Sequence, residues 1–183
     1  MKVTILNGNS DPANCSFDEY LADLERYWSR RGHAVGTLEL RSMTIAYCTG
    51  CFGCWVKTPG ECVARDDSAF VRHAVIHSDL VVMASPVIMG FPSALIKKMT
   101  DKLLPNLHPY FMIDQGEIHH KPRYKRYPRM GLLLERKQDT DEEDLAIIES
   151  LYRRLALNMK TPLCFTRLTT DPLPEVAHEI DHI

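Results

Sequence analysis

Five consecutive apolar residues, Leu80-Val81-Val82-Met83-Ala84, constrain the fold more than any other stretch of this sequence. A strand that is apolar at every position presents hydrophobic side chains to both faces of its sheet, so both faces must be covered. Parallel sheets in α/β proteins meet this requirement, because the helices that connect their strands pack on both faces. The run therefore predicts a central strand of a parallel sheet.

Four further segments resemble strands, and helical patterns separate them. The predicted strands are 2–6, 33–40, 80–84, 130–134 and 162–166, and the predicted helices are 16–30, 66–77, 93–104 and 141–159. With right-handed crossovers this order gives an α/β fold with a doubly wound parallel sheet, and five strands suit the flavodoxin-like order 2-1-3-4-5. A chain of 183 residues is expected to form a single domain, 1–183.

In a sheet of this order, ligands bind between strands 1 and 3, where the strand order reverses. The loop after strand 1 is rich in Gly, Asn and Ser, contains no Lys or Arg, and leads into a helix. Such a loop offers backbone N–H groups and the positive end of the helix dipole to a phosphate, which suits the monophosphate of FMN. An ordinary capped turn is the alternative. The candidate cofactor-binding residues of this first loop are Gly8, Asn9, Ser10, Asn14, Cys15 and Ser16.

The loop after strand 3 combines an apolar stretch with free backbone groups, as a flat aromatic ligand needs. A plain strand-to-helix turn at Pro86 is the alternative. The candidate cofactor-binding residues of this second loop are Ser85, Pro86, Val87, Ile88, Met89 and Gly90.

Four of the six cysteines fall in a cysteine-rich loop, 46–65, with the spacing C-x2-C-x2-C-x7-C. Bacterial ferredoxins begin with the same C-x2-C-x2-C run, so a [4Fe–4S] cluster is the first candidate. A zinc site and a loop of free or oxidisable thiols are the alternatives. The loop leaves the carboxyl end of strand 2, so we expect it close to the flavin. The candidate metal ligands are Cys48, Cys51, Cys54 and Cys62.

These motifs together resemble the NAD(P)H-dependent FMN reductases of flavodoxin-like fold, and more closely their branch of iron–sulfur flavoproteins. The resemblance rests on 8–16, on the cysteine motif followed by Asp66-Asp67, on Ser78-Asp79, on Ser85-Pro86-Val87 and on Lys97 with Asp101. It implies an oxidoreductase with FMN at the two loops, NAD(P)H as the electron donor and a small-molecule or protein electron acceptor. It also implies a homodimer or homotetramer and a [4Fe–4S] cluster at the four cysteines. No side-chain catalytic set stands out, because the flavin would carry the chemistry.

The rest of the chain is less informative. Residues 105–128 are expected to be an irregular insertion. The basic run 119–129 is a candidate contact for the phosphate of NADPH or for another subunit, through Lys121, Arg123, Lys125 and Arg126, with His119 and His120 at the surface. A non-enzymatic, zinc-stapled binding module that uses this run is the alternative function. Clustered cysteines, a start too short for a signal peptide and a net charge of −2 predict a cytoplasmic protein with no nucleic-acid or membrane partner.

Overall fold

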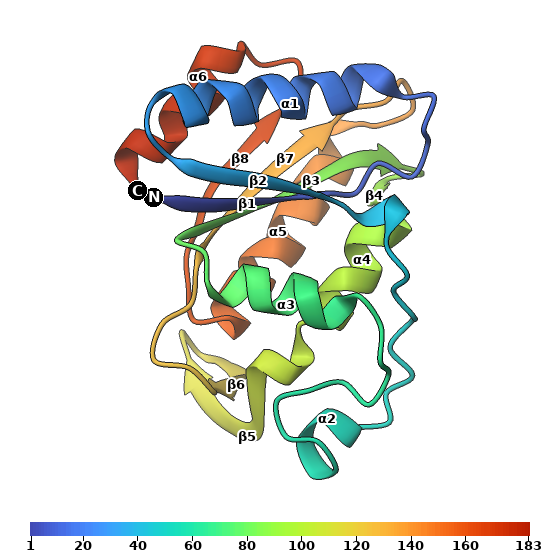
Figure 1. Cartoon of the computed structure of the whole chain (residues 1–183), viewed down its shortest axis with the longest axis vertical. Helices are drawn as coiled ribbons and strands as arrows, with labels where there is room; N and C mark the ends of the chain where they lie inside the picture. The colour runs from blue at the N-terminus through green and yellow to red at the C-terminus, as the bar shows by residue number, and fades with distance from the viewer.

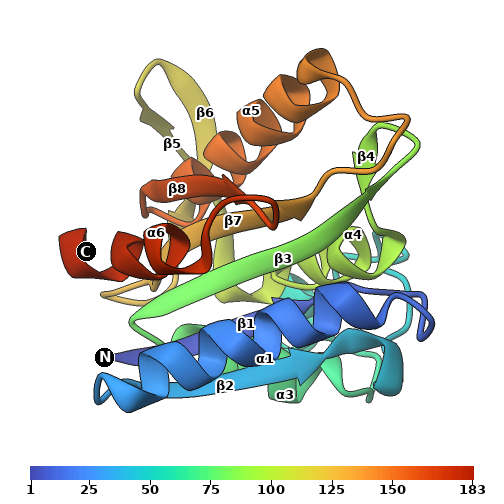
Figure 2. The ribbon, with the colours of Figure 1, turned by 90° about the horizontal axis from the view of Figure 1, so that it is seen from above.

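The computed structural model describes all residues from 1 to 183, and its main sheet has five parallel strands in the order β2-β1-β3-β7-β8. Figure 2 shows these strands side by side. Numbered among themselves, they have the predicted order 2-1-3-4-5, so the flavodoxin-like fold is confirmed. The strands are β1 (Lys2–Asn7), β2 (Ala34–Glu39), β3 (Leu80–Ile88), β7 (Arg129–Glu135) and β8 (Leu163–Leu168).

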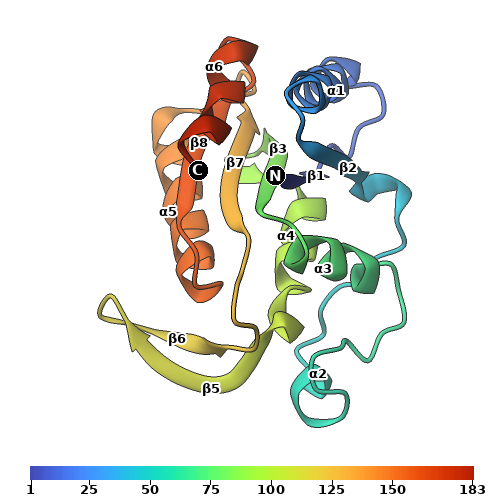
Figure 3. The same cartoon turned by 60° about the vertical axis from the view of Figure 1, so that its left-hand side comes forward.

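Helices cover both faces of the sheet (Figures 1 and 3). The first face carries α1 (Cys15–Arg30) and α6 (Leu173–His178), and the second carries α3 (Ser68–Ile76), α4 (Ala94–Asp101) and α5 (Glu142–Asn158). Each face has its own hydrophobic core. Val81 and Met83 belong to the core under α3, α4 and α5, whereas Leu80, Val82 and Ala84 belong to the core under α1 and α6. The apolar run in β3 thus serves both faces, as predicted.

The apolar residues of helix α1 recur at helical spacing and pack into the core. Phe17, Leu21, Leu24 and Trp28 recur at helical spacing and are all buried. The indole Nε1 of Trp28 donates a hydrogen bond of 2.9 Å to the carbonyl of Ala177. This bond anchors α6 to α1, and no period in the tail after Thr169 predicts that helix.

Strand β3 is longer than predicted. The sequence predicts a strand over 80–84 and a loop over 85–90, but β3 continues to Ile88 and turns back into β4 (Phe91–Pro92), which pairs with it antiparallel. The extension follows from pairing with β7, where Ser85 lies opposite Leu134 and Pro86 opposite Glu135. The second loop is therefore the end of a strand and the tip of a hairpin.

The prediction of an irregular insertion over 105–128 is wrong for most of its length. A turn, η2 (Leu104–Asn106), leads into a hairpin of β5 (Leu107–Asp114) and β6 (Glu117–Pro122). Gln115 and Gly116 between them have φ values of 50° and 82°, which is the backbone of a two-residue type I′ turn. The hairpin lies at the same end of the molecule as α2 (Gly53–Val56) in Figure 1.

Two short 3-10 turns complete the chain, η1 (Leu40–Ser42) after β2 and η3 (Glu179–His182) at the carboxyl end. None of the helices has both the length and the apolar character that crossing a membrane would require.

Candidate functional site

The loops after β1 and β3 meet at the point where the strand order reverses. The backbone N–H of Gly8 donates to the carbonyl of Ala84 at 2.8 Å, and the hydroxyl of Ser93 donates to the carbonyl of Gly8 at 2.5 Å. A Cβ atom on residue 8 would overlap Cγ1 of Ile96 and lie 3.0 Å from the Ala84 carbonyl oxygen. Only glycine permits this approach, so Gly8 joins the two loops.

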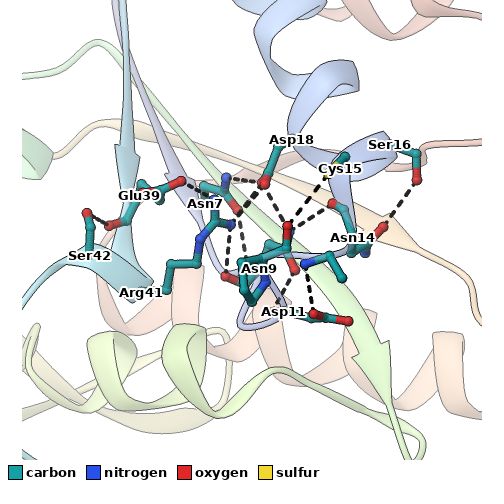
Figure 4. Close-up of polar contacts among 12 residues, drawn as sticks. Asn7, Asn9, Asp11, Asn14, Cys15, Ser16, Asp18, Glu39, Arg41 and Ser42 are labelled. Atoms are coloured by element: carbon teal, nitrogen blue, oxygen red, sulfur yellow. Dashed lines mark hydrogen bonds and ion pairs between the residues drawn. The ribbon is translucent and has the colours of Figure 1, made fainter.

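Asparagine side chains fold the first loop from within (Figure 4). Oδ1 of Asn7 accepts from the N–H of Asn9 at 2.8 Å, and Oδ1 of Asn9 accepts from the N–H of Asp11 at 3.1 Å. Nδ2 of Asn9 also donates to the carbonyl of Asn14 at 3.0 Å. Asn9 is fully buried, so it shapes the loop, whereas Ser10 is exposed to solvent.

The amino end of α1 is open. Asn14 occupies the N-cap position, but its side chain makes no capping hydrogen bond. The backbone N–H groups of Cys15, Ser16 and Phe17 donate in none of the hydrogen bonds of the structure, and the first two residues are exposed. Free donors at the positive end of a helix dipole are a ready site for a phosphate.

Charged residues that the sequence does not assign to the site lie beside this loop. Arg41 in η1 forms an ion pair of 2.9 Å with Asp18 of α1. Glu135, at the carboxyl end of β7, accepts from Nδ2 of Asn14 at 2.7 Å and pairs with Lys137 at 2.5 Å. Both carboxylates are thus compensated, which reduces their repulsion of a bound phosphate. The sheet order predicts the place of Glu135, but nothing in the sequence marks Arg41.

The second loop offers a ligand only its tip. Of its six predicted residues, the first three are buried in the end of β3 and the last three lie at the hairpin turn; these are Ser85, Pro86 and Val87, then Ile88, Met89 and Gly90. The hydroxyl of Ser85 accepts from the N–H of Ser93 at 2.8 Å, so it holds the start of α4. Met89 is 88% exposed and Ile88 is 43% exposed. The part of this loop that a flat ring system can contact is therefore the exposed apolar surface at the hairpin tip.

Two aspartates close the base of the cysteine loop by hydrogen bonds to its backbone. Asp67 accepts from the N–H of Thr44 at 2.7 Å and donates its own N–H to the carbonyl of Thr44 at 3.0 Å. Asp66 accepts from the N–H of Ala46 at 3.0 Å and from that of Ser68 at 2.9 Å. These hydrogen bonds join the two ends of the cysteine loop, at 44–46 and 66–67, and fix its base.

The four candidate ligands Cys48, Cys51, Cys54 and Cys62 line one cavity of about 130 Å³. Cys48 and Cys51 are exposed, Cys54 is buried and Cys62 is half-buried. Burial, reinforced by the neighbouring sulfurs, raises the pKa of Cys54. A hydrogen bond from the backbone of Gly53, helped by Thr49, lowers the pKa of Cys51.

The donor set around this cavity is four thiols. A zinc ion binds four thiolates at about 2.3 Å from one atom, whereas a [4Fe–4S] cluster takes one thiolate on each of its four irons. The chemistry of this lining fits a thiolate-held centre of either kind.

The cysteine loop rests on the β5–β6 hairpin. Nε1 of Trp55 in α2 donates to the carbonyl of Leu107 at 3.0 Å, and its ring stacks on Phe52 with a centroid separation of 5.4 Å. Figure 1 places α2 at the opposite end of the long axis from α1. The loop leaves the expected edge of the sheet but then folds away from the first loop, so the predicted proximity to the flavin is not found within one chain.

A second cavity, of about 480 Å³, lies beside the cysteine loop. It runs from Cys48 and Gly50 in the cysteine loop to Phe91 and Pro92 in β4, between α4 and α5. Most of its lining is apolar, which suits an uncharged, flat molecule better than an ion.

The basic run 119–129 lies at the amino end of the strands, opposite the two loops. Arg126 pairs with Asp79 immediately before β3, and Arg123 donates to the carbonyl of Leu107 at 3.2 Å. His119 is only 8% exposed, because β6 turns its side chain inward, so its expected surface position is wrong. Part of this run therefore holds the hairpin in place.

Comparison with known proteins agrees with this geometry. No protein-family model matches the sequence. The chain is 38% identical over 108 residues to an iron-sulfur flavoprotein of Archaeoglobus fulgidus, which covers 58% of this chain and 46% of that protein. The match thus spans about half the length of the curated relative. The resemblance to iron–sulfur flavoproteins that the sequence motifs predict is confirmed.

Two solved structures share the fold. An NADH:FMN oxidoreductase in its apo form matches 99% of this chain and 87% of its own, with a TM-score of 0.58 and 11% identity. An NAD(P)H:quinone oxidoreductase from Methanothermobacter marburgensis matches 99% of this chain and 93% of its own, with a TM-score of 0.61 and 16% identity. At these identities the likeness establishes the flavodoxin-like fold.

Proposed function

We propose that this chain is a flavin-dependent oxidoreductase that binds FMN, takes electrons from NADH or NADPH, and passes them on through a [4Fe–4S] cluster. The observation that carries the proposal is the single cavity lined by Cys48, Cys51, Cys54 and Cys62 beside a flavodoxin-like sheet. An iron-sulfur flavoprotein as a relative supports it. The acceptor is a small molecule or a protein.

When bound, FMN exchanges a hydride with a nicotinamide and a cluster transfers single electrons. The exposed first turn of α1, at Cys15 and Ser16, would hold the phosphate with backbone N–H groups. Arg41 keeps the neighbouring carboxylate of Asp18 compensated. The hairpin tip at Met89 would give the ring system an apolar surface.

The protein shapes the cysteine centre in two ways. Gly53 brings the backbone close to the ligands, since a Cβ atom at this position would lie 2.5 Å from Val63 and 3.5 Å from the sulfur of Cys51. Trp55 fixes α2 on the hairpin and limits the movement of the loop. Backbone N–H groups directed at ligand sulfurs tune the potential of such centres.

Assembly into a homodimer or homotetramer is part of the proposal. Large apolar side chains are exposed on each of the two hairpins, β3–β4 and β5–β6, and groups of exposed apolar side chains are candidate protein contacts. The exposed residues are Ile88, Met89 and Phe91 near β4 and Tyr110, Phe111, Ile113 and Ile118 on β5–β6. A second subunit at these hairpins would cover them.

The alternative, a zinc-stapled binding module that uses 119–129, has less support. Arg123 and Arg126 of this run are engaged in internal contacts, and the relative found by sequence is an iron-sulfur flavoprotein.

Anaerobic reduction tests the proposal. Protein reconstituted with FMN and iron is mixed with NADH or NADPH, while flavin absorbance and the electron paramagnetic resonance (EPR) signal are followed. We expect bleaching of the flavin and then the signal of a reduced cluster. A bound flavin that neither nucleotide reduces would contradict the proposed activity.

Binding of FMN is tested separately by thermal unfolding. A ligand at 100 times its dissociation constant adds about 2.7 kcal/mol to the stability of the folded state. Protein that neither retains FMN nor gains stability in its presence would contradict the flavin site.

A further inference from the structure

Lys102 is a buried ammonium group beside the cysteine cavity. Its side chain is 2% exposed, although lysine is almost never fully buried without a partner. It is the residue that follows α4, and the negative end of that helix dipole favours a cation there. Lys102 belongs to the lining of the same cavity as the four cysteines.

Two groups accept hydrogen bonds from this ammonium. Nζ of Lys102 lies 3.2 Å from the sulfur of Cys62 and 3.0 Å from Oδ2 of Asp66, whose side chain is 6% exposed. An ammonium has three N–H donors, so one remains without a protein acceptor. Lys102 thus connects Cys62, the fourth cysteine of the motif, to Asp66 at the base of the loop.

The charges of Lys102 and Asp66 are matched by their surroundings. The ammonium and the carboxylate form an ion pair of 3.0 Å, and both side chains are more than nine-tenths buried. Asp66 also accepts from the backbone N–H groups of Ala46 and Ser68. An opposite charge and hydrogen-bond donors around a carboxylate favour the charged form of each group.

Stability alone does not account for such a pair. Removing two charges from water costs several kcal/mol per ion, and an apolar replacement of similar volume is often equally stable. Lys160 makes a comparable ion pair of 3.0 Å with Asp114, but there the lysine is 14% exposed and its hydrogen bond goes to the carboxylate and not to a sulfur. What distinguishes Lys102 is its contact with a metal-ligand sulfur.

We propose that Lys102 is a positioning residue of the cysteine centre, which holds the sulfur of Cys62 in the ligand set and favours the reduced form of the bound cluster by its positive charge. This inference rests on the proposed metal site and goes beyond it by assigning a residue outside the cysteine motif. Asp66, bonded to the lysine and not to the sulfur, moderates the effect and fixes the lysine.

The sign of the effect follows from electrostatics. A cluster held by four thiolates becomes more negative by one charge on reduction, so a nearby cation stabilises the reduced form more than the oxidised form. Removal of the lysine charge should lower the reduction potential. Removal of the aspartate charge should raise it, because the ammonium is then uncompensated.

Three variants test the inference in the iron-loaded protein. Lys102→Met removes the charge and the donors but keeps the length of the side chain, and Lys102→Arg keeps the charge. Lys160→Met is the matched control. Iron content, thermal unfolding and the midpoint potential from an EPR-monitored titration are measured for each.

We expect Lys102→Met to reduce the ratio of reduced to oxidised cluster at fixed potential at least tenfold, which is about 59 mV for one electron. Lys102→Arg should retain most of the wild-type potential, and Lys160→Met all of it. Loss of iron from a Lys102→Met protein that still unfolds at the wild-type temperature would support the positioning role.

If Lys102→Met does not fold, Asp66→Asn provides the test, with an upward shift expected. A Lys102→Met protein with wild-type iron content and potential would overturn the inference alone, as would a downward shift in Asp66→Asn. A wild-type protein that binds no iron would overturn the metal site, and the inference with it.

Discussion

Substitution of Gly8 by alanine tests whether close contact between two loops builds the cofactor site. A Cβ atom at this position would overlap Cγ1 of Ile96, lie 2.9 Å from the hydroxyl of Ser93 and lie 3.0 Å from the carbonyl oxygen of Ala84. None of these neighbours moves easily. Ile96 is fully buried, and the Ser93 hydroxyl already donates to Gly8.

The expected cost follows from this crowding. Overpacking of a filled core costs about 1–3 kcal/mol, and three fixed contacts place Gly8→Ala in the upper part of that range, at about 2–3 kcal/mol. A domain of this size loses about 2–4 °C of melting temperature per kcal/mol, so we expect a decrease of about 4–12 °C. Displacement of the loop should also weaken FMN binding at least about tenfold, or 1.4 kcal/mol.

Gly36→Ala is the matched control, because Gly36 lies in β2, next to β1, and an added Cβ would meet nothing within 4 Å. Alanine in a strand interior is favoured over glycine by about 0.5–1 kcal/mol, so this variant should be as stable as wild type or more stable. Melting followed by circular dichroism and FMN titration provide the data. A Gly8→Ala protein that melts and binds FMN like wild type would show that the contact between the two loops does not shape the cofactor site.

Three further predictions concern other parts of the molecule. Cys51→Ser should remove iron and leave FMN in place, while Cys164→Ser should keep both iron and FMN. Metal and flavin analysis of the two variants gives the result. A wild-type iron content in Cys51→Ser would exclude Cys51 as a ligand. The backbone N–H of Lys2, helped by Arg126, holds the pKa of Asp79 below its ordinary value. This contact should stabilise the fold above the unfolded pKa of about 3.9 and be lost as pH falls through the folded pKa. Urea unfolding of Asp79→Asn should thus show a deficit at pH 6 that shrinks toward pH 2.5, and a constant deficit would be evidence against the contact. Arg126→Gln should leave the FMN content unchanged, because the basic run lies at the opposite end of the strands from the two flavin loops. Loss of flavin from this variant would contradict that placement of the flavin site.

Much of the fold can be predicted from the hydrophobic periodicity of the sequence. The apolar run at 80–84 and the helical spacing from Phe17 to Trp28 indicate a parallel sheet with helices on both faces, and five such strands suit the flavodoxin-like order. The hairpin over 107–122 has no strong sequence signal, because its strands lack a clean alternation. The two central turn residues are Gln115 and Gly116, and only Gly116 favours a positive φ, whereas type I′ turns typically carry Asn-Gly or Asp-Gly.

The residues of the candidate site can be predicted from the sequence only where residue spacing or strand order determines where they lie. The cysteine spacing places four sulfurs around one cavity, and the topology brings the loops after β1 and β3 together. Arg41 and Lys102 could not be found in this way. Each reaches its partners from an element remote in sequence, through a contact that depends on how helices and turns pack and leaves no local pattern. The extension of β3 to Ile88 has the same origin, because pairing with β7 as far as Pro86 and with β4 at Val87 and Ile88 decides it.

We expect one chain to carry both a flavin and a cluster. Iron, sulfide and flavin are therefore measured in protein purified without oxygen and supplied with FMN. We expect about four iron atoms and about four sulfides for each chain, together with bound FMN. Protein that lacks iron or lacks flavin, or that binds zinc in place of iron, would contradict the proposed function.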